Sequence, residues 1–280
     1  MQIIPLNKTH DGHLELQASI NGVTGTFVLD TGATGTVLDI NKLSQFGLSV
    51  GQERINGVAV GDKETGRIDT FPVEITEFSI HRNKVDIKLI FANDVSGQLG
   101  PEVMGLVGND ALINLNALID VKNSQLLIPQ QKNDPQSVLA ESSMGTYETI
   151  SLQKSPMGFS FVDVKINEND VRLLVDTGAP QIVLDESALV QLGYKLEEHP
   201  TAKSVVAEGV ELPMKVYKNG FIALGNLTLS DDFFTTDFTA LMNAVNVEGE
   251  PKLIGILGNK HLAQLNTIID ASNAKLYIKN

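Results

Sequence analysis

The pattern of apolar and polar positions predicts a β-hairpin at the start of the chain. Residues 13–20 alternate between polar and apolar side chains, and residues 23–30 form a second β-type run. The dipeptide Asn21-Gly22 between them is a strong signal for a type I′ turn. The same order returns at 159–166 and 171–176, around a longer polar segment for which we expect a four-residue turn.

Short helices are predicted after each hairpin. Asp39 and Asp185 precede 40–46 and 186–192, and an aspartate at this position caps a helix by accepting a hydrogen bond from a free backbone N–H. Each half of the chain then reads as several strands separated by turn residues. Helical segments remain few, so the fold class is mainly β.

The two hairpins belong to an internal repeat. Residues 21–47 match 167–193 without a gap, and 105–128 match 255–278. A repeat of this length sets the architecture of a protein. It predicts two homologous lobes, at 1–131 and 147–280, joined by a polar, proline-containing linker at 132–146.

Composition narrows the classes of function. A net charge of −13 disfavours nucleic-acid binding, which needs clustered basic residues. The chain has no cysteine, which excludes disulfides and thiolate chemistry. His10 and His13 are close in sequence but have no partner carboxylate cluster, so we expect solvated histidines, no metal site and no cofactor.

The sequence does not by itself determine the cellular compartment of the protein. No apolar run approaches the ~20 residues that a membrane helix needs, and the N-terminal segment has no basic region followed by an apolar one. We expect no membrane span and see no signal peptide.

The repeat also places one aspartate of each half in the same setting. Asp30 and Asp176 each end a β-type run and begin the string Asp-Thr-Gly-Ala. Two carboxyl groups brought within about 3 Å share one proton and titrate as a pair. The ionised member can accept a proton from water while the protonated member polarises a carbonyl, which is general acid–base hydrolysis of an amide.

The neighbours of the two aspartates suit this chemistry. We expect Thr31 and Thr177 to bond across the interface between the lobes. Gly32 and Gly178 are expected to let backbone amides approach the carboxylates and to adopt turn dihedrals closed to other residues. The later elements Gly-Leu-Val-Gly-Asn (105–109) and Gly-Ile-Leu-Gly-Asn (255–259) are expected to pack beneath the two turns.

These motifs resemble those of the aspartic peptidases, specifically the retropepsin-like branch. The hallmark is an apolar pair before Asp-Thr-Gly-Ala and a distant apolar-apolar-Gly before a short helix. The chain has Val-Leu-Asp-Thr-Gly-Ala at 28–33 with Leu-Val-Gly at 106–108, and Leu-Val-Asp-Thr-Gly-Ala at 174–179 with Ile-Leu-Gly at 256–258. The resemblance covers both halves and implies a bilobal acid-protease fold with two β-barrel lobes and short helices.

The resemblance also implies roles for individual residues. Asp30 and Asp176 would form the catalytic dyad, supported by Thr31, Gly32, Ala33, Thr177, Gly178 and Ala179. Each lobe would carry a β-hairpin flap over the substrate. Position and glycine content place the flap residues at Val58, Ala59, Val60, Gly61, Val205, Val206 and Ala207.

Three departures from related patterns matter. Thr34 and Pro180 stand where retroviral members usually carry a substrate-binding aspartate, and asparagine replaces the arginine that often follows the downstream glycine. Pepsin-type motifs have Ser or Thr where this chain has Ala33 and Ala179. Losing that hydroxyl donor raises the pKa of a carboxylate, so we expect a mildly acidic to near-neutral optimum.

The function predicted from the sequence is an aspartic endopeptidase that acts on polypeptides as a monomer. One alternative is a peptide-binding module that keeps the fold without turnover, and another is an enzyme whose lobes pair between chains. The repeated Asp120 and Asp270 precede closing hairpins and are interpreted as turn residues. Tandem members of this type are mostly extracytoplasmic, which favours a periplasmic or secreted protein.

Overall fold

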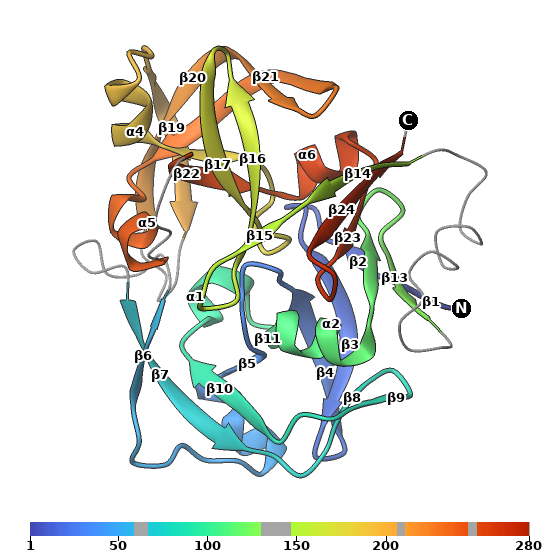
Figure 1. Ribbon diagram of the computed structural model, residues 1–280. Helices are drawn as coiled ribbons and strands as arrows, with labels where there is room; N and C mark the ends of the chain where they lie inside the picture. Colours follow the sequence, from blue (N-terminus) through green and yellow to red (C-terminus); the bar gives the residue numbers. More distant parts are fainter. Residues whose placement is uncertain (59–66, 130–146, 206–210, 246–250, 280) are drawn as a thin grey trace.

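β-Strands dominate both halves of the protein, which form an upper and a lower lobe in Figure 1. The computed structural model describes residues 1–58, 67–129, 147–205, 211–245 and 251–279. The fold is mainly β and bilobal, as the sequence predicts.

The elements of the N-terminal half are β1 (Gln2–Pro5), β2 (Asn7–Lys8), β3 (Leu14–Ile20), β4 (Val23–Leu29), β5 (Val37–Asp39), the 3₁₀ helix η1 (Ile40–Phe46), β6 (Ile55–Val58), β7 (Arg67–Glu74), β8 (Phe78–Ile80), β9 (Asn83–Val85), β10 (Leu89–Asn93), α1 (Ser96–Leu99), β11 (Val103–Val107), α2 (Asn109–Leu115), β12 (Leu118–Asp120) and β13 (Gln125–Ile128).

Those of the C-terminal half are β14 (Tyr147–Ser151), β15 (Gln153–Lys154), β16 (Ser160–Ile166), β17 (Asn169–Val175), β18 (Val183–Asp185), α4 (Glu186–Gln191), β19 (Glu197–Val205), β20 (Glu211–Leu224), β21 (Leu227–Thr236), α5 (Thr239–Val245), β22 (Leu253–Leu257), α6 (Asn259–Gln264), β23 (Thr267–Asp270) and β24 (Lys275–Lys279).

Alternation of side chains produces the opening hairpin of each half. In β3, every second residue from Leu14 to Ile20 is buried, because successive side chains of a strand point to opposite faces. Asn21 and Gly22 both have positive φ, as a type I′ turn requires. The four-residue turn expected in the second half is wrong: Ile166 pairs with Asn169, so only two residues connect β16 to β17.

The sheet of each lobe brings the strand before the Asp-Thr-Gly turn beside a strand from much later in the chain. In the N-terminal lobe, β11 pairs in parallel with β4 and antiparallel with β5. In the C-terminal lobe, β22 pairs in the same way with β17 and β18. In each lobe, the Asp-Thr-Gly turn connects the two strands that flank β11 or β22. The turn therefore lies at the end of that central strand.

A further sheet joins the two lobes. Its strand order is β1-β13-β12-β23-β24-β14, so the closing hairpins of the two halves lie edge to edge. Leu118 pairs with Asp270, Ile119 with Ile269 and Asp120 with Ile268. Seen in Figure 1, these strands lie on the right, where green and red segments meet. The sheet continues the backbone hydrogen bonding from one lobe into the other.

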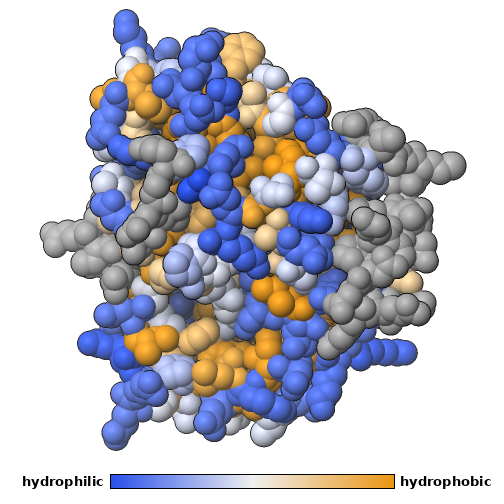
Figure 2. Space-filling view, in the orientation of Figure 1, coloured by the Kyte–Doolittle hydropathy of each residue, from blue (hydrophilic) through white to orange (hydrophobic). Residues whose placement is uncertain are grey.

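Among the residues that the structure describes, apolar side chains form one large core and two smaller clusters. The largest cluster runs through both halves, from Ile4 to Ile278. A second cluster lies in the C-terminal lobe around Phe159, and a third lies at the joining sheet around Tyr277. In the face shown in Figure 2, hydrophilic side chains occupy most of the edge and hydrophobic ones gather mainly nearer the middle.

The predicted helix caps are present. The Asp39 side chain accepts from the Asn41 N–H at the start of η1, and the Asp185 side chain accepts from the Ala188 N–H at the start of α4. Among the described residues, every helix is too short or too polar to span a membrane.

Candidate active site

The two Asp-Thr-Gly turns meet where the lobes face each other. The Asp30 N–H donates to the Val107 carbonyl at 3.0 Å, and the Asp176 N–H donates to the Leu257 carbonyl at 3.1 Å. These bonds continue the parallel pairing of β4 with β11 and of β17 with β22. The sheet of each lobe thus fixes the place where its aspartate leaves the strand.

Each carboxyl group lies directly against the glycine of the opposite turn. A Cβ atom added to Gly32 would lie 2.5 Å from Cγ of Asp176, and one added to Gly178 would lie 2.6 Å from Cγ of Asp30. Neither glycine has a positive φ, so the expectation of special turn dihedrals is wrong. Glycine is needed here because the carboxylate of the other lobe occupies the space of a side chain.

The two carboxyl groups also interact with each other. They share a side-chain hydrogen bond, and each accepts backbone amides from its own turn. The Asp30 Oδ1 atom accepts from Gly32 at 2.7 Å and from Ala33 at 3.1 Å. The Asp176 Oδ1 atom accepts from Gly178 at 2.7 Å. This is the arrangement of a proton-sharing pair.

Burial raises the pKa of both carboxyl groups. The pKa of Asp30 lies well above its usual value because the group is desolvated and because the Asp176 charge is adjacent. The pKa of Asp176 is also raised by burial, although the hydrogen bond with Asp30 and the backbone amides of its own turn lower it. One proton is therefore retained by the pair at pH values where isolated aspartates are ionised.

The two threonines interlock across the lobes. The Thr31 hydroxyl donates to the Val175 carbonyl at 2.9 Å and accepts from the Thr177 N–H at 3.0 Å. The Thr177 hydroxyl donates to the Leu29 carbonyl at 2.7 Å and accepts from the Thr31 N–H at 3.0 Å. Both side chains are buried, so each turn is held by the backbone of the other lobe.

The downstream Gly-Asn elements support the turns from below. A Cβ atom on Gly108 would lie 2.5 Å from the Gly35 carbonyl oxygen, and one on Gly258 would collide with the Gln181 carbonyl. Asn109 donates from Nδ2 to the Thr31 carbonyl at 2.7 Å, and Asn259 does the same to Thr177 at 2.6 Å. The expected packing beneath the turns is present.

The two lobes differ in how they hold the chain after the turn. Asp110 of α2 accepts from the Thr36 N–H at 2.9 Å and from the Thr36 hydroxyl at 2.8 Å. In the other lobe, Nδ1 of His261 accepts from the Ile182 N–H at 3.0 Å, and Nε2 lies 3.1 Å from Asp231. His261 is buried, so the expectation that all histidines are solvated is wrong for this residue.

Two loops that sequence reasoning did not single out cross between the lobes. In the loop 9–13, a Cβ atom on Gly12 would lie 3.7 Å from Pro180. In the loop 155–159, one on Gly158 would lie 3.6 Å from Thr34. Each loop thus packs beside the turn of the opposite lobe. A matched Ser or Thr followed three residues later by Gly, at the same spacing as the repeat, is the signal that marks them in the sequence.

Two of the predicted flap residues, Val58 and Val205, end strands of antiparallel pairs. Val58 ends β6, pairs with Arg67 of β7 and packs against the Phe159 cluster of the other lobe. Val205 ends β19 and pairs with Glu211 of β20. The remaining residues named for the flaps, Ala59, Val60, Gly61, Val206 and Ala207, are outside the described residues.

Asp120 and Asp270 have structural roles, as predicted. The Asp120 carboxylate accepts from the backbone N–H and from the side chain of Asn123, at 3.0 and 2.8 Å. Asp270 makes the same pair of bonds to Asn273, both at 2.9 Å. These carboxylates stabilise the turns of the closing hairpins.

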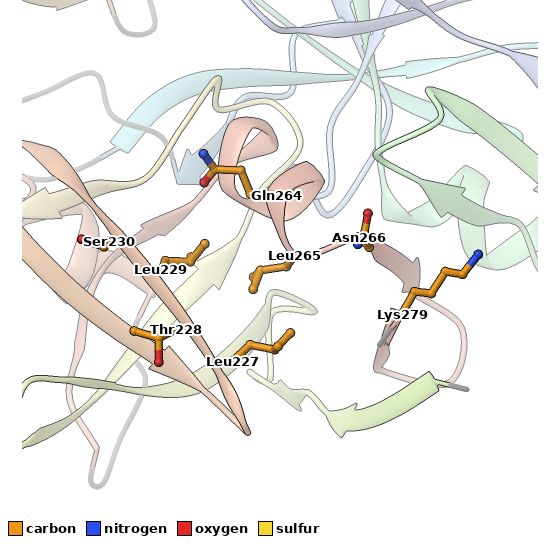
Figure 3. A pocket seen from close by; sticks show the side chains of 8 residues that line it. All are labelled: Leu227, Thr228, Leu229, Ser230, Gln264, Leu265, Asn266 and Lys279. Carbon is orange, nitrogen blue, oxygen red and sulfur yellow. The ribbon is translucent and has the colours of Figure 1, made fainter. Parts of the chain in front are cut away.

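A shallow hollow of about 300 Å³ lies apart from the Asp-Thr-Gly turns. In Figure 3, Leu227, Leu229 and Leu265 gather on one side of it and Lys279 lies on the other. None of its lining residues belongs to either turn, so this hollow is separate from the paired carboxyl groups.

Comparisons with known proteins agree with this geometry. The family model described as "Aspartyl protease" matches residues 16–111 and 162–260, which together make up more than half of the chain. Among solved structures, the fold is similar to an aspartic proteinase from Irpex lacteus, with a TM-score of 0.57 and 12% identity. That match covers 100% of this chain and 97% of the other. A search of curated proteins finds no match.

Proposed function

Since this chain belongs to the aspartyl protease family, we propose that it is an endopeptidase whose catalytic groups are Asp30 and Asp176. Family and fold support a peptidase in general. The observation that carries the finer proposal is the contact of each carboxyl group with the opposite turn and with the other carboxyl group. A pair placed in this way holds one proton and one negative charge for acid–base chemistry.

Hydrolysis follows from that charge state. A water molecule between the carboxyl groups gives one proton to the ionised aspartate while its oxygen attacks the carbon of the scissile carbonyl. The protonated aspartate gives its proton to the carbonyl oxygen, which produces a neutral diol. Transfer of a proton to the amide nitrogen then accompanies cleavage of the C–N bond. Neither metal nor covalent intermediate is needed for these steps.

The surrounding residues have supporting roles in this proposal. Thr31 and Thr177 keep the two turns at a fixed separation. The Gly32 and Gly178 amides donate to the carboxylates, and the absence of side chains at these glycines lets the pair form. The hairpins β6–β7 and β19–β20 are proposed as flaps, with an extended polypeptide bound beneath them through its backbone.

The operating pH is proposed to be mildly acidic to near neutral. Ala33 and Ala179 offer only backbone N–H groups to the carboxylates, and burial raises the pKa of both aspartates. A raised pKa keeps the shared proton in place at higher pH. A pH–rate profile that peaks in strong acid would contradict this part of the proposal.

The decisive test is cleavage of an unstructured protein by Asp30→Asn and Asp176→Asn variants. Each substitution removes an acid–base group and should lower kcat/KM by about 10³-fold or more. Asp120→Asn is the matched control, because Asp120 is also a repeated aspartate but lies in a turn; it should retain activity. The intact protein should also be tested between about pH 3 and pH 8, which is roughly the range in which carboxyl and imidazole groups titrate. If it binds peptides tightly but cuts none in this range, it is a binding module instead.

One chain carries both half-sites, so we propose that the monomer is active. The lobes are proposed to comprise residues 1–131 and 147–280, with the linker at 132–146. Sedimentation of the working enzyme should give the mass of a single 30.2 kDa chain. Activity that appears only in a dimer would point to lobes pairing between chains.

A further inference from the structure

The apolar cluster around Phe159 contacts both the turn of Asp176 and the first proposed flap. Ala179 of that turn packs against the cluster, and so does Val58 at the end of β6 in the other lobe. Helix α5, which contributes Leu241 to the cluster, packs against β6 and lies directly above it in Figure 1. The cluster thus extends from the turn that holds one carboxyl group to the strand proposed to cover it.

The partly buried side chains of this cluster form a surface that we call the apolar wall. They are Val58, Ala179, Ala202, Phe234, Met242 and Leu253. Both proposed flaps contribute, through β6 and β19, and so do α5, β21 and β22. A large apolar side chain of a substrate placed against these residues would remove apolar surface from water, and this burial favours binding.

The matching sheet of the N-terminal lobe carries a charged residue in place of a buried phenylalanine. Phe161 of the cluster pairs with Leu174, and Glu15 pairs with Val28 at the same register of the repeat. The Glu15 carboxylate accepts from Nδ2 of Asn7 at 2.9 Å. Val28 is buried but belongs to none of the three clusters found among the described residues. Within these residues, the N-terminal lobe therefore has no counterpart of the cluster.

The helix beside the apolar wall also differs between the lobes. α5 begins three residues after Thr236 and α1 begins three residues after Asn93, and these two residues pair with the matched capping aspartates. α5 has seven residues and buries Leu241 and Val245, whereas α1 has four residues. The residue of α1 that corresponds to Leu241 is Gln98, which is exposed. The N-terminal lobe thus has polar side chains at positions where the C-terminal lobe has buried apolar ones.

We propose that the apolar wall makes substrate recognition one-sided. A large apolar residue of the polypeptide binds beside Asp176, and a small or polar residue binds beside Asp30. Met242 of α5 determines this preference, because its unbranched, partly buried side chain adapts to apolar groups of different shape. The inference rests on the proposed catalytic pair and adds the class of substrate that the same site selects.

The first experiment locates the apolar residue of the substrate on the protein. The Asp30→Asn protein is mixed with a peptide of Ser and Ala that carries one central benzoylphenylalanine, which is a photoreactive apolar residue. After irradiation, mass spectrometry should find the peptide attached to residues of the apolar wall, with Met242 among them. Attachment mainly to α1, or in equal amounts to α1 and α5, would overturn the proposal.

The second experiment maps cleavage by the active enzyme. Peptides of Ser and Ala with a single Phe should be cut on one side of that Phe at least about 10-fold faster than on the other, because only one side of the dyad gains from burying the ring. Replacing the Phe with Ser should lower kcat/KM by about 10- to 100-fold. Equal cleavage on both sides of the Phe would contradict one-sided recognition.

Substitution of Met242 tests the residue itself. Met242→Glu places a carboxylate in the apolar wall, so it should lower kcat/KM for the Phe peptide by about 10-fold or more and raise it for the matching Lys peptide. Leu99→Glu is the matched control, because Leu99 is partly buried at the corresponding position of α1. It adds the same charge outside the wall and should change both values by less than about twofold. Equal effects of the two glutamate variants would overturn the assignment.

A milder variant secures the measurement if Met242→Glu fails to fold. Met242→Ala removes apolar contact without adding a charge and should lower kcat/KM for the Phe peptide by about 3- to 10-fold. An unchanged value would refute the role of Met242.

The two levels of the proposal fail separately. Cross-linking does not depend on cleavage, so selective attachment to the apolar wall in a protein that cuts no peptide would refute the proposed hydrolysis and retain one-sided recognition. Cleavage on both sides of the Phe by an active enzyme would refute one-sided recognition alone.

Discussion

The N-terminal and C-terminal lobes use the same groups at the dyad and different groups one layer away from it. Both lobes present an aspartate, a cross-lobe threonine and an asparagine that bonds the threonine carbonyl. Behind the turn, the first lobe uses the Asp110 carboxylate and the second uses the His261 ring. Groups that face their counterpart or bond the Asp-Thr-Gly turn itself are the same in both lobes, whereas the groups that hold the chain behind the turn have diverged.

The divergence gives the lobes opposite pH responses. Burial raises the pKa of Asp110, so its contribution to stability is present at low pH and is lost as the pH rises through its folded pKa. Burial lowers the pKa of His261. Its neutral ring accepts from Ile182, so its contribution is present above the unfolded pKa of about 6.5 and is lost as the pH falls through the folded value.

Removing either of the two diverged groups should lower the free energy of unfolding, and the loss of His261 should have the largest effect of all. His261→Ala deletes a buried ring that lies 5.5 Å from the ring of Phe233 and leaves the Ile182 N–H unpaired, which should cost about 3–4 kcal/mol near neutral pH. Asp110→Ala leaves the Thr36 N–H and hydroxyl without their acceptor and should cost about 2 kcal/mol. Urea denaturation measures both.

The loss of unfolding free energy in these two variants should change with pH in opposite directions, which tests the difference between the lobes. The cost of His261→Ala should shrink as the pH falls below about 6.5, and that of Asp110→Ala should shrink as the pH rises above the ordinary aspartate value of 3.8. Parallel trends for the two variants would show that the lobes do not respond to pH in opposite ways.

The shared threonines should show equal effects in the two lobes. Thr31→Val and Thr177→Val each leave one buried N–H and one buried carbonyl without a partner, so each should cost about 2–3 kcal/mol and reduce cleavage. Thr→Ser at the same positions keeps the hydroxyl and serves as the control. A large difference between the two valine variants would mean that the interlock is not symmetric in energy.

Replacing the two capping aspartates with alanine should lower the free energy of unfolding by modestly different amounts. The Asp185 carboxylate accepts from Ala188 and also, at 2.8 Å, from the Phe238 N–H. The Asp39 Oδ2 atom is buried and has no partner among the described residues. Asp185→Ala should therefore cost about 2 kcal/mol and Asp39→Ala about 1 kcal/mol. Thermal unfolding of the two variants tests this order, and a reversal would contradict it.

Substitution in the dyad should have the smallest effect on stability, and it should stabilise the protein where the other substitutions destabilise it. Burial and the adjacent Asp176 raise the pKa of Asp30, so ionisation of the pair destabilises the folded state as the pH rises above 3.8. Asp30→Asn removes this cost and should raise Tm near neutral pH by about 2–4 °C. The gain should vanish in strong acid, where the wild-type pair is protonated. A lower Tm at neutral pH would show that the pair is not under electrostatic strain.

Features that repeat along the chain could be predicted from the sequence. The two Asp-Thr-Gly turns, the caps at Asp39 and Asp185 and the hairpin turn at Asn21-Gly22 each depend on a few neighbouring residues whose chemistry is visible locally. The length of the second hairpin turn could not be read in this way. Register, rather than the polarity of the intervening residues, decides that Ile166 pairs with Asn169.

Features that need two distant segments were missed. The pairing of β12 with β23 depends on how the lobes dock, and neither strand contains a signal for it. The contact of Gly12 with Pro180 and the burial of His261 against Asp231 also join segments that are far apart in the sequence. The need for Gly32 was recognised but attributed to backbone dihedrals, because the carboxylate that occupies its space comes from the other half of the chain.

The sheet that joins the lobes has a consequence for biosynthesis. β12 can complete its hydrogen bonding only after β23, which lies near the C-terminal end, has been made. Pairing between strands so distant in sequence is a slow step in folding, and an unpaired edge is prone to aggregation until it closes. The half-chain that leaves the ribosome first holds one carboxyl group without its counterpart, so the proposed hydrolysis requires both halves to be made and docked.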